Sequence, residues 1–255
     1  MVQLPAQPPL RRDLRVQRRR PPEKRSVRFL KDAAFVIVAA VVLSFLLKTF
    51  LVQSFYIPSE SMQPTLEKLD RVLVTKLAPG LLKVHRGDVI VFKDPGGWTT
   101  QTEPDPPGEG FLADVSAGAR AVAEVIGLAP SESEDFLIKR VIGLGGDTVA
   151  CEGNGAPVTV NGVALDETYI MPGVEPSIAE FSTEVPAGAV WVMGDNRPRS
   201  GDSRAHISNQ PLGGAVSLDN VVGIAQVRTW PLDRMALLRN PGRVFASVPN
   251  LGGGS

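Results

Sequence analysis

The sequence has little of what several common kinds of functional site require. Of its 255 residues, one is a cysteine and two are histidines. The single cysteine, Cys151, excludes an intrachain disulfide framework and a cysteine-based zinc site. His85 and His206 are too few for a histidine-rich metal centre, so we expect neither a metal nor a cofactor. The 25 glycines and 22 prolines are too many for a helical bundle.

Charge is balanced over the whole chain but not along it. The 27 basic residues equal the 27 acidic residues in number. Residues 1–31 contain ten basic and two acidic residues, which gives +8 there and leaves −8 on the rest. A basic end of this kind suggests a membrane or nucleic-acid partner. Because the segment has too little apolar material for a core, we expect it to be disordered.

A long apolar segment follows the basic end. Fifteen uncharged residues run from Ala33 to Leu47, and TFLV follows Lys48 up to Val52. A bilayer core requires roughly 20 residues, so residues 32–52 are predicted to form one transmembrane anchor, with Lys48 reaching the outer interface. The preceding positive charge predicts a cytoplasmic N-terminus and an extracytoplasmic domain from residue 53 to 255. A cleaved secretory signal is the alternative, but no small-x-small site follows the apolar run.

Residues 53–255 have the pattern of a mainly β domain. Asn161-Gly162, between two alternating arms, predicts a hairpin with a type I′ turn. Residues 94–135 interrupt the pattern and are interpreted as a surface insertion with a short helix near 117–128. The tail from Pro241 is expected to fray. Short apolar runs bounded by turn residues, which are typical of sandwiches and barrels, occupy residues 71–77, 88–92, 136–143, 190–193 and 221–227.

Four short blocks contain the candidate chemistry, and each is ambiguous alone. PSESMQPTL (58–66) and GDNRPRSGDSR (194–204) have the composition of turns and loops, and RGDVIVF (86–92) has that of a turn entering a strand. FLIKRVIGLGGD (136–147) contains Lys139 among apolar neighbours. An outward-pointing lysine on an alternating strand is the ordinary interpretation. A buried lysine would instead have a lowered pKa, and its neutral amine could act as general base for a serine.

Together, and in this order, the four blocks resemble the motifs of the bacterial type I signal peptidases, the membrane-bound leader peptidases. In that family a serine box follows a transmembrane anchor. A GD-plus-strand box, a KRVIGLPGD-like box and a GDNRxxSxDSR box come after it, and the last of these is matched completely here. The resemblance implies a mainly β fold with two antiparallel β-sheet units around a Ser/Lys dyad, after one N-terminal transmembrane helix.

The resemblance also implies roles for individual residues. Ser61 matches the nucleophile, Lys139 the general base, and Ser200 the serine that orients the lysine. The oxyanion hole corresponds to the Ser59 hydroxyl and the backbone N–H of Ser61. Charged residues that hold the site loops together correspond to Asp195, Arg140, Asp202 and Arg204. Residues that line the substrate pockets correspond to Ile57, Met62 and Ile138.

Two positions depart from the family pattern. Gly145 stands where the family usually has proline, and Glu60 stands where glycine is common. Neither change removes a catalytic group, although Glu60 lies where it could alter the rim of the site.

The implied function is that of a serine endopeptidase of the bacterial cell membrane. It would remove N-terminal signal peptides from translocated preproteins, cutting after small residues at −1 and −3. Its partners would be signal peptides and the lipid bilayer, without nucleic acid. Two alternatives stay open, namely a related Ser/Lys processing peptidase with a narrower substrate and a non-catalytic membrane-anchored β-domain.

A catalytic triad is a third alternative, at the level of mechanism. It would combine Ser61 with His85 or His206 and an acid such as Asp202. The Ser/Lys dyad is favoured because Lys139 lies in a matched block and neither histidine does.

Overall fold

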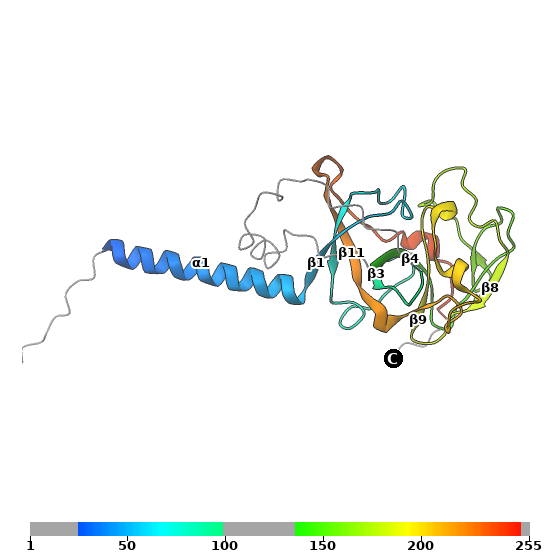
Figure 1. Ribbon diagram of the computed structural model, residues 1–255, viewed down its shortest axis with the longest axis horizontal. Coiled ribbons are helices and arrows are strands. Elements are labelled where there is room, and N and C mark those ends of the chain that lie inside the picture. Colours follow the sequence, from blue (N-terminus) through cyan, green and yellow to red (C-terminus); the bar gives the residue numbers. More distant parts are fainter. Residues whose placement is uncertain (1–24, 99–135, 251–255) are drawn as a thin grey trace, which may run out of the picture. The chain divides into compact units, whose positions relative to one another are not determined.

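A computed structural model describes residues 25–98 and 136–250, which form one long helix and two β-sheets (Figure 1). The chain divides into two units after Val42. Residues 99–135, which make up most of the expected insertion and include the expected short helix, lie outside the described residues. Residues 1–24 of the expected tail also lie outside them.

Helix α1 spans Arg25–Phe50. It begins inside the segment that was expected to be disordered, because the last prolines before it are Pro21 and Pro22 and nothing after them interrupts a helix. Its large apolar side chains between Phe29 and Leu43 are exposed, as Phe35 at 75% illustrates.

The transmembrane anchor expected at residues 32–52 is not supported by the structure. Within the two described ranges, no helix combines the length and the apolar character that crossing a membrane requires. Val52, the last residue of that expected span, begins the first β-strand instead.

The larger sheet has eight antiparallel strands, in the order β1–β2–β11–β3–β4–β9–β10, with β12 paired to β11. All five strands that the apolar runs predicted are present in it. β3 and β4 pair directly with each other, although the insertion separates them in sequence. The strands are β1 (Val52–Tyr56), β2 (Arg71–Thr75), β3 (Val89–Lys93), β4 (Phe136–Leu144), β9 (Ala189–Met193), β10 (Val216–Ser217), β11 (Val221–Trp230) and β12 (Ala236–Leu237).

The smaller sheet has four antiparallel strands in the order β7–β6–β5–β8. They are β5 (Thr148–Cys151), β6 (Thr159–Val160), β7 (Val163–Ala164) and β8 (Phe181–Glu184). β6 and β7 form the predicted hairpin, and Asn161 and Gly162 have the two positive φ angles, 54° and 77°, that a type I′ turn requires. The mainly β fold with two antiparallel sheets is therefore confirmed.

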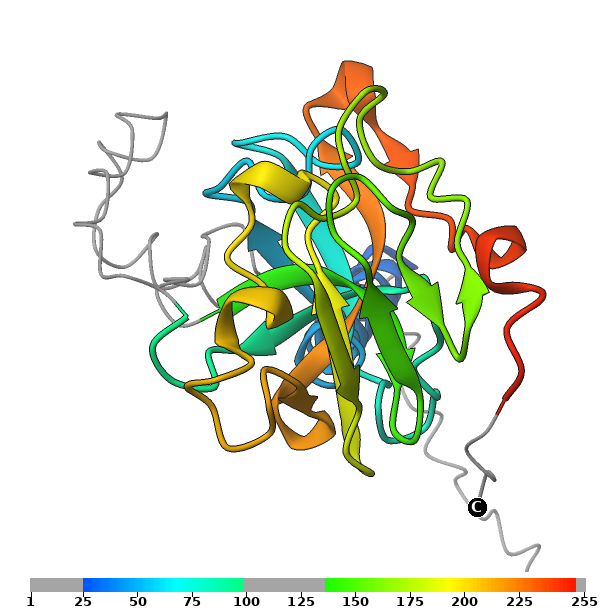
Figure 2. The ribbon, with the colours of Figure 1, turned by 90° about the vertical axis from the view of Figure 1, so that its right-hand side faces the viewer.

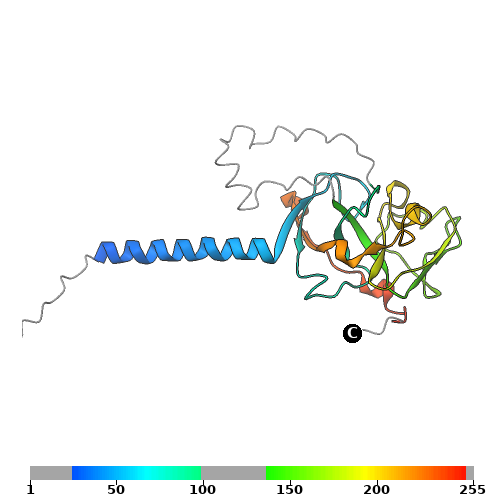
Figure 3. The ribbon, with the colours of Figure 1, turned by 60° about the horizontal axis from the view of Figure 1, so that its bottom comes forward.

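The described residues also contain five short 3₁₀ helices. Figures 2 and 3 show η1 and η2, in yellow, beside the strands. The helices are η1 (Arg197–Arg199), η2 (Ser203–His206), η3 (Leu218–Asn220), η4 (Leu232–Arg234) and η5 (Gly242–Phe245).

The C-terminal segment is packed rather than frayed, at least as far as Asn250. Phe245 and Val248 are buried in the hydrophobic cluster that also contains much of the smaller sheet. Arg86 Nη1 donates a 2.8 Å hydrogen bond to Asn250 Oδ1. The expectation of a frayed tail from Pro241 was therefore wrong, because an apolar residue every few positions gives this segment something to bury.

Candidate active site

Ser61 and Lys139 meet in the interior of the β domain. Ser61 lies in the turn that follows β1, and Lys139 lies on β4 opposite Ile90 of β3. A 2.8 Å hydrogen bond joins Lys139 Nζ to Ser61 Oγ across 78 positions of sequence. Ser61 is 5% exposed and Lys139 is 2% exposed. The structure thus brings together the two residues that the sequence paired as nucleophile and base.

The environment of Lys139 favours the neutral amine. Six consecutive residues of β4, from Ile138 to Gly143, are buried, so the side chain cannot reach water as an exposed strand lysine would. Burial lowers the pKa of Lys139 from 10.5 to about 8, although the nearby carboxylates of Asp202 and Asp195 act in the opposite direction. An amine with this pKa is a competent base for a serine hydroxyl near neutral pH.

The two groups expected to form an oxyanion hole are the Ser59 hydroxyl and the Ser61 N–H. Ser59 Oγ lies 3.2 Å from Ser61 Oγ. The backbone N–H of Ser61 is not used in any hydrogen bond among the described residues. The role of these two groups as donors in an oxyanion hole stays a prediction.

The segment after β9 holds the backbone of the serine turn. Asn196 N–H donates to Ser61 O at 3.0 Å, and Asn196 Nδ2 donates to Glu60 O at 3.0 Å. A Cβ atom on Gly194 would lie 2.5 Å from Ser61 O and 2.3 Å from Ser200 Oγ, so only glycine fits there. Sequence reasoning missed both Gly194 and Asn196, although the first three letters of the GDNR block contain them.

Ser200 is near the dyad, but the expected bond to the lysine is absent. Its Oγ is buried and makes no hydrogen bond of acceptable geometry with any described group. The hydroxyl lies close enough to the Asp202 carboxylate to contribute to lowering that group's pKa. Its assignment as the residue that orients Lys139 remains a prediction.

Arg140 and Asp195 form a buried ion pair next to the dyad. Arg140 Nε and Nη2 donate to the two Asp195 carboxylate oxygens at 2.8 and 2.6 Å. The Thr65 hydroxyl donates to the same carboxylate, and the guanidinium lies 4.3 Å from the centre of the Tyr169 ring. Because Arg140 follows Lys139 on β4, its side chain points to the opposite face of the sheet. Because Arg140 Nη2 also donates to the Thr65 hydroxyl at 3.2 Å, the pair and Thr65 together connect β4 and the segment after β9 to the turn that carries Ser61.

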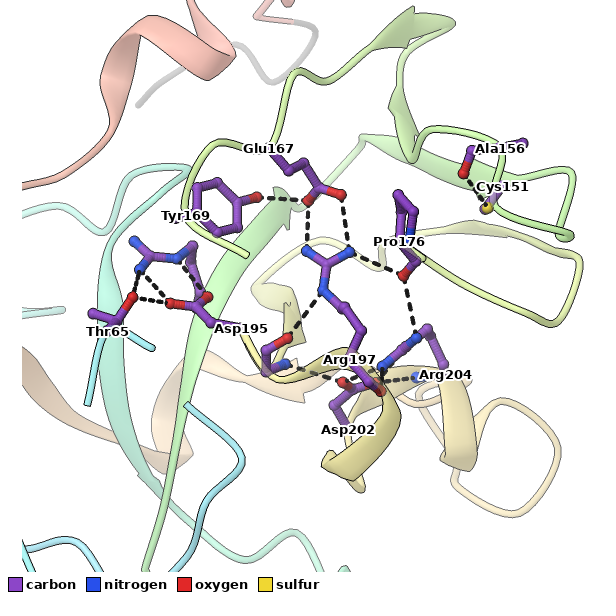
Figure 4. A network of polar contacts seen from close by, with 12 residues as sticks. Thr65, Cys151, Ala156, Glu167, Tyr169, Pro176, Asp195, Arg197, Asp202 and Arg204 are labelled. Carbon is purple, nitrogen blue, oxygen red and sulfur yellow. Dashed lines mark hydrogen bonds and ion pairs between the residues drawn. The ribbon is translucent and has the colours of Figure 1, made fainter. Parts of the chain in front are cut away.

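A second group of ion pairs holds the loop at residues 194–204 (Figure 4). Arg204 Nε and Nη2 each donate to the Asp202 carboxylate at 2.9 Å. Burial alone would raise the pKa of Asp202, but Arg204 and the Gly194 N–H hold it below its usual value. Arg197 donates to both oxygens of Glu167 and, through Nε, to Gly194 O at 2.9 Å. Arg197 thereby holds the carbonyl group of Gly194, the residue that lies against Ser61.

Four residues that form these ion pairs or contact them were not predicted from the sequence. Thr65 and Arg197 lie inside the motif blocks, but nothing distinguished them from their neighbours. Glu167 and Tyr169 lie outside all four blocks, in a stretch that reads only as the end of a hairpin. No signal in the single sequence could have found these last two.

The residues expected to line substrate pockets lie together. Ile57, Met62 and Ile138 are 1%, 0% and 6% exposed and belong to one hydrophobic cluster beside the dyad. Two cavities of about 140 and 240 Å³ lie elsewhere, along the segment from Leu238 to Pro241. Neither is lined by Ser61 or Lys139, so neither is a candidate for the reaction centre.

In the described residues, the two histidines make their contacts away from the Ser61 hydroxyl. His206 stacks on Trp98 with ring centres 4.4 Å apart and an interplanar angle of 12°. The His85 side chain is 70% exposed beside Asp88. Neither imidazole contacts Ser61 within the described ranges, so the geometry favours the dyad over a histidine triad. Among the same residues, no cluster of His, Cys, Asp and Glu is arranged to hold a metal ion.

Glu60, which departs from the family pattern, lies at the rim of the site. Its carboxylate pairs with Nη1 of Arg199, and both side chains are substantially exposed. An exposed pair of this kind contributes little to stability, but it links the serine turn to η1.

Comparison of the sequence with known proteins finds relatives among peptidases. A family model described as "Signal peptidase, peptidase S26" matches residues 30–230. Signal peptidase I of Mycobacterium tuberculosis (strain H37Rv) is 39% identical over 240 residues, covering 86% of this chain and 78% of that protein. Signal peptidase I of Leptolyngbya laminosa is 35% identical over 212 residues, covering 83% and 85%.

A solved structure is matched more weakly. A crystal structure of a signal peptidase I from Enterococcus faecalis V583 shows 25% identity over 56% of this chain and 96% of that chain, with a TM-score of 0.34. A score this low supports no argument about the arrangement of the site.

Proposed function

Because the chain belongs to the signal peptidase family, peptidase S26, it is a peptidase, and we propose that it removes the N-terminal signal peptides of translocated preproteins by a Ser/Lys dyad. The observation that carries the proposal is the 2.8 Å bond between a buried Lys139 Nζ and Ser61 Oγ. The relatives named signal peptidase I support the substrate class.

The described groups suffice for a two-step acyl transfer. The neutral Lys139 amine takes the proton of Ser61 Oγ as that oxygen attacks the scissile carbonyl carbon. The oxyanion accepts hydrogen bonds from the Ser61 N–H and the Ser59 hydroxyl, each worth about 3–4 kcal/mol of barrier. The lysine ammonium then protonates the leaving amine and becomes neutral again. The neutral amine next takes a proton from the water that attacks the acyl-enzyme, and it returns this proton to Ser61 Oγ as the acyl bond breaks.

Preference for small residues at −1 and −3 fits the side chains beside the dyad. Ile57, Met62 and Ile138 are already packed within a hydrophobic cluster, so a substrate side chain next to Ser61 must be small. The proposal assigns these three residues to the walls that set this limit. Enlarging the space with Met62→Ala should admit a larger residue at −1.

We propose further that the chain is bound to the bacterial cell membrane through its N-terminal region, with the β domain outside. This part rests on the sequence, since no described helix qualifies as a span. The uncharged run from Ala33 to Leu47, the exposed apolar side chains of α1 and the +8 segment before them support it. Ser61 follows the end of α1 by eleven residues, which suits a peptide bond just outside a membrane.

The test is cleavage of a preprotein by the purified full-length chain in detergent. We expect one cut after a small residue, located by mass spectrometry of the two products. Ser61→Ala and Lys139→Ala should each lower turnover by at least about a thousandfold while they keep the wild-type circular dichroism spectrum. A wild-type chain with no Ser61-dependent cleavage would exclude the peptidase assignment and favour a non-catalytic β-domain.

A further inference from the structure

Helix η2 takes the place of a neighbouring strand along part of β9. β10 pairs with β9 only at Val190 and Ala189. Farther along, the Val192 N–H donates to Ser203 Oγ at 2.9 Å, and the Gly194 N–H donates to Asp202 Oδ2 at 3.0 Å. The backbone at the end of β9 is thus held by the side chain of Ser203 in η2 and by that of Asp202, the N-cap residue of η2.

These two hydrogen bonds hold the end of β9 and Gly194, the glycine that lies against Ser61. Gly194 lies directly against Ser61 O, and the next residues, Asp195 and Asn196, bond to Arg140 and to Ser61 O. A shift of η2 would therefore move Gly194 toward or away from the serine turn. The same shift would move the Asp202 carboxylate, which acts on Lys139 through its charge.

The far end of η2 is fixed by aromatic stacking. His206, the last residue of η2, lies flat on Trp98, and Trp98 packs edge-on against Phe92 of β3 with ring centres 5.7 Å apart. Trp98 is 8% exposed and belongs to the hydrophobic cluster between β3, β4 and β9. Gln210 Nε2 adds a hydrogen bond to Gly96 O. The stack therefore connects η2 to the core of the larger sheet.

The imidazole has no polar task among the described residues. Nδ1 is buried without a hydrogen-bond partner there, and the ring lies stacked on Trp98. A phenyl ring of similar size and flatness could make the same contact. This separates a packing role for His206 from a role in proton transfer.

We propose that His206 is a positioning residue of the peptidase: its stack on Trp98 fixes η2 so that Asp202 and Ser203 hold Gly194 in register against Ser61. The proposal rests on the function proposed above, because cleavage is one of its readouts. Part of the geometry on which turnover depends would then come from the His206–Trp98 stack, which lies outside the dyad. Misplacing a catalytic group by about 1 Å can cost up to about a hundredfold in rate.

The experiment compares His206→Ala, His206→Phe and wild type in the full-length chain, with His85→Ala as the matched control on the other histidine. Steady-state cleavage of one preprotein-derived peptide gives kcat and KM separately. Amide hydrogen exchange followed by NMR reports the Val192 and Gly194 N–H groups directly. Val149 on β5 of the smaller sheet serves as the internal reference for overall stability.

We expect His206→Ala to lower kcat by between about 10- and 100-fold with little change in KM. Its Val192 and Gly194 amides should exchange faster while Val149 does not change. His206→Phe and His85→Ala should behave as wild type in both measurements.

The opposite outcomes are equally informative. Wild-type kinetics and exchange in His206→Ala would overturn the proposal, as would failure of His206→Phe to rescue. Loss of activity in both His206 variants, with normal exchange, would also overturn the proposal and would show that the imidazole acts through its polar atoms. If the wild-type chain cleaves no preprotein, the proposed function fails, and the exchange arm still decides whether the stack positions Gly194.

Discussion

At the scale of the residue, the burial of Lys139 should make the proposed reaction depend on pH. Only the neutral amine can accept the proton of Ser61, and burial lowers the pKa of Lys139 from 10.5 to about 8. We therefore expect kcat/KM for a peptide substrate to rise with pH and to level off above about 8, when measured from about pH 6 to 10. A limb near 10 would contradict burial of the amine. A limb near about 6.5 that vanishes in His206→Ala would contradict the lysine base itself.

Because a buried ammonium is costly, the wild-type chain should be less stable at pH 7 than a variant that has no amine at position 139. Between about pH 8 and 10.5 the unfolded chain holds a proton on Lys139 that the folded chain lacks, so wild-type stability rises with pH across this window. At pH 7 the buried ammonium costs up to about 3 kcal/mol, partly offset by hydrogen bonds worth about 1 kcal/mol each.

Lys139→Met should therefore unfold at a higher denaturant concentration than wild type at pH 7, and this advantage should shrink toward pH 10. Chemical denaturation followed by circular dichroism at both pH values measures the difference. Lys139→Arg serves as the control, because it keeps a buried charge that cannot be neutralised. Equal stability of wild type and Lys139→Met at pH 7 would show that the ammonium is well solvated.

Single residues differ in how far the sequence could place them. An apolar strand with one lysine has an ordinary surface interpretation, and only the order of the four motif blocks marked Lys139 as buried. Glu167 and Tyr169 had no local signal, because their role is to support Arg197 and Arg140 from across the fold. Contacts of that kind depend on chain packing, which local pattern does not encode.

At the scale of the element, the junction of β9 with the loop at residues 194–204 sets the position of the serine turn. Gly194→Ala would push a methyl group into Ser61 O and Ser200 Oγ. We expect kcat/KM to fall by at least about a hundredfold, since the nucleophile must move. Gly201→Ala, in the same loop, meets no atom within 4 Å and should stay within about twofold of wild type. Equal activity of the two variants would show that the serine turn yields without cost.

Elements were predictable where their residues follow a local period. The five main strands alternate or run apolar between turn residues, and the Asn161-Gly162 turn requires positive φ at both positions. The placement of β11 between β2 and β3 was not predictable, because pairing between distant strands leaves no local mark. The tail was misjudged for a related reason: its glycine and proline suggest a loose end, whereas Phe245 and Val248 find a core built elsewhere.

At the scale of the whole molecule, the site depends on segments that are far apart in sequence. The antiparallel order β3–β4–β9 brings Lys139 beside the segment that holds Ser61, and the Arg140–Asp195 pair connects them at a buried position. Removing one partner of a buried ion pair leaves the other charge unpaired, which typically costs about 3–5 kcal/mol. A loss of this size affects folding and catalysis together, so alanine variants at these positions do not report on chemistry alone.

The β domain by itself does not indicate on which side of the cell membrane it lies. The charge of +8 on residues 1–31 and the uncharged run that follows predict a cytoplasmic N-terminus and a β domain outside the cell membrane. With an epitope tag before residue 1, protease added to intact spheroplasts should digest the β domain and leave the tag protected. In lysed spheroplasts both should be digested, which is the control for access. The tagged chain should also stay in the membrane fraction after an alkaline carbonate wash, because apolar contact with lipid does not depend on charge. A β domain protected in intact spheroplasts would contradict the orientation, and release by the wash would contradict insertion of the apolar run.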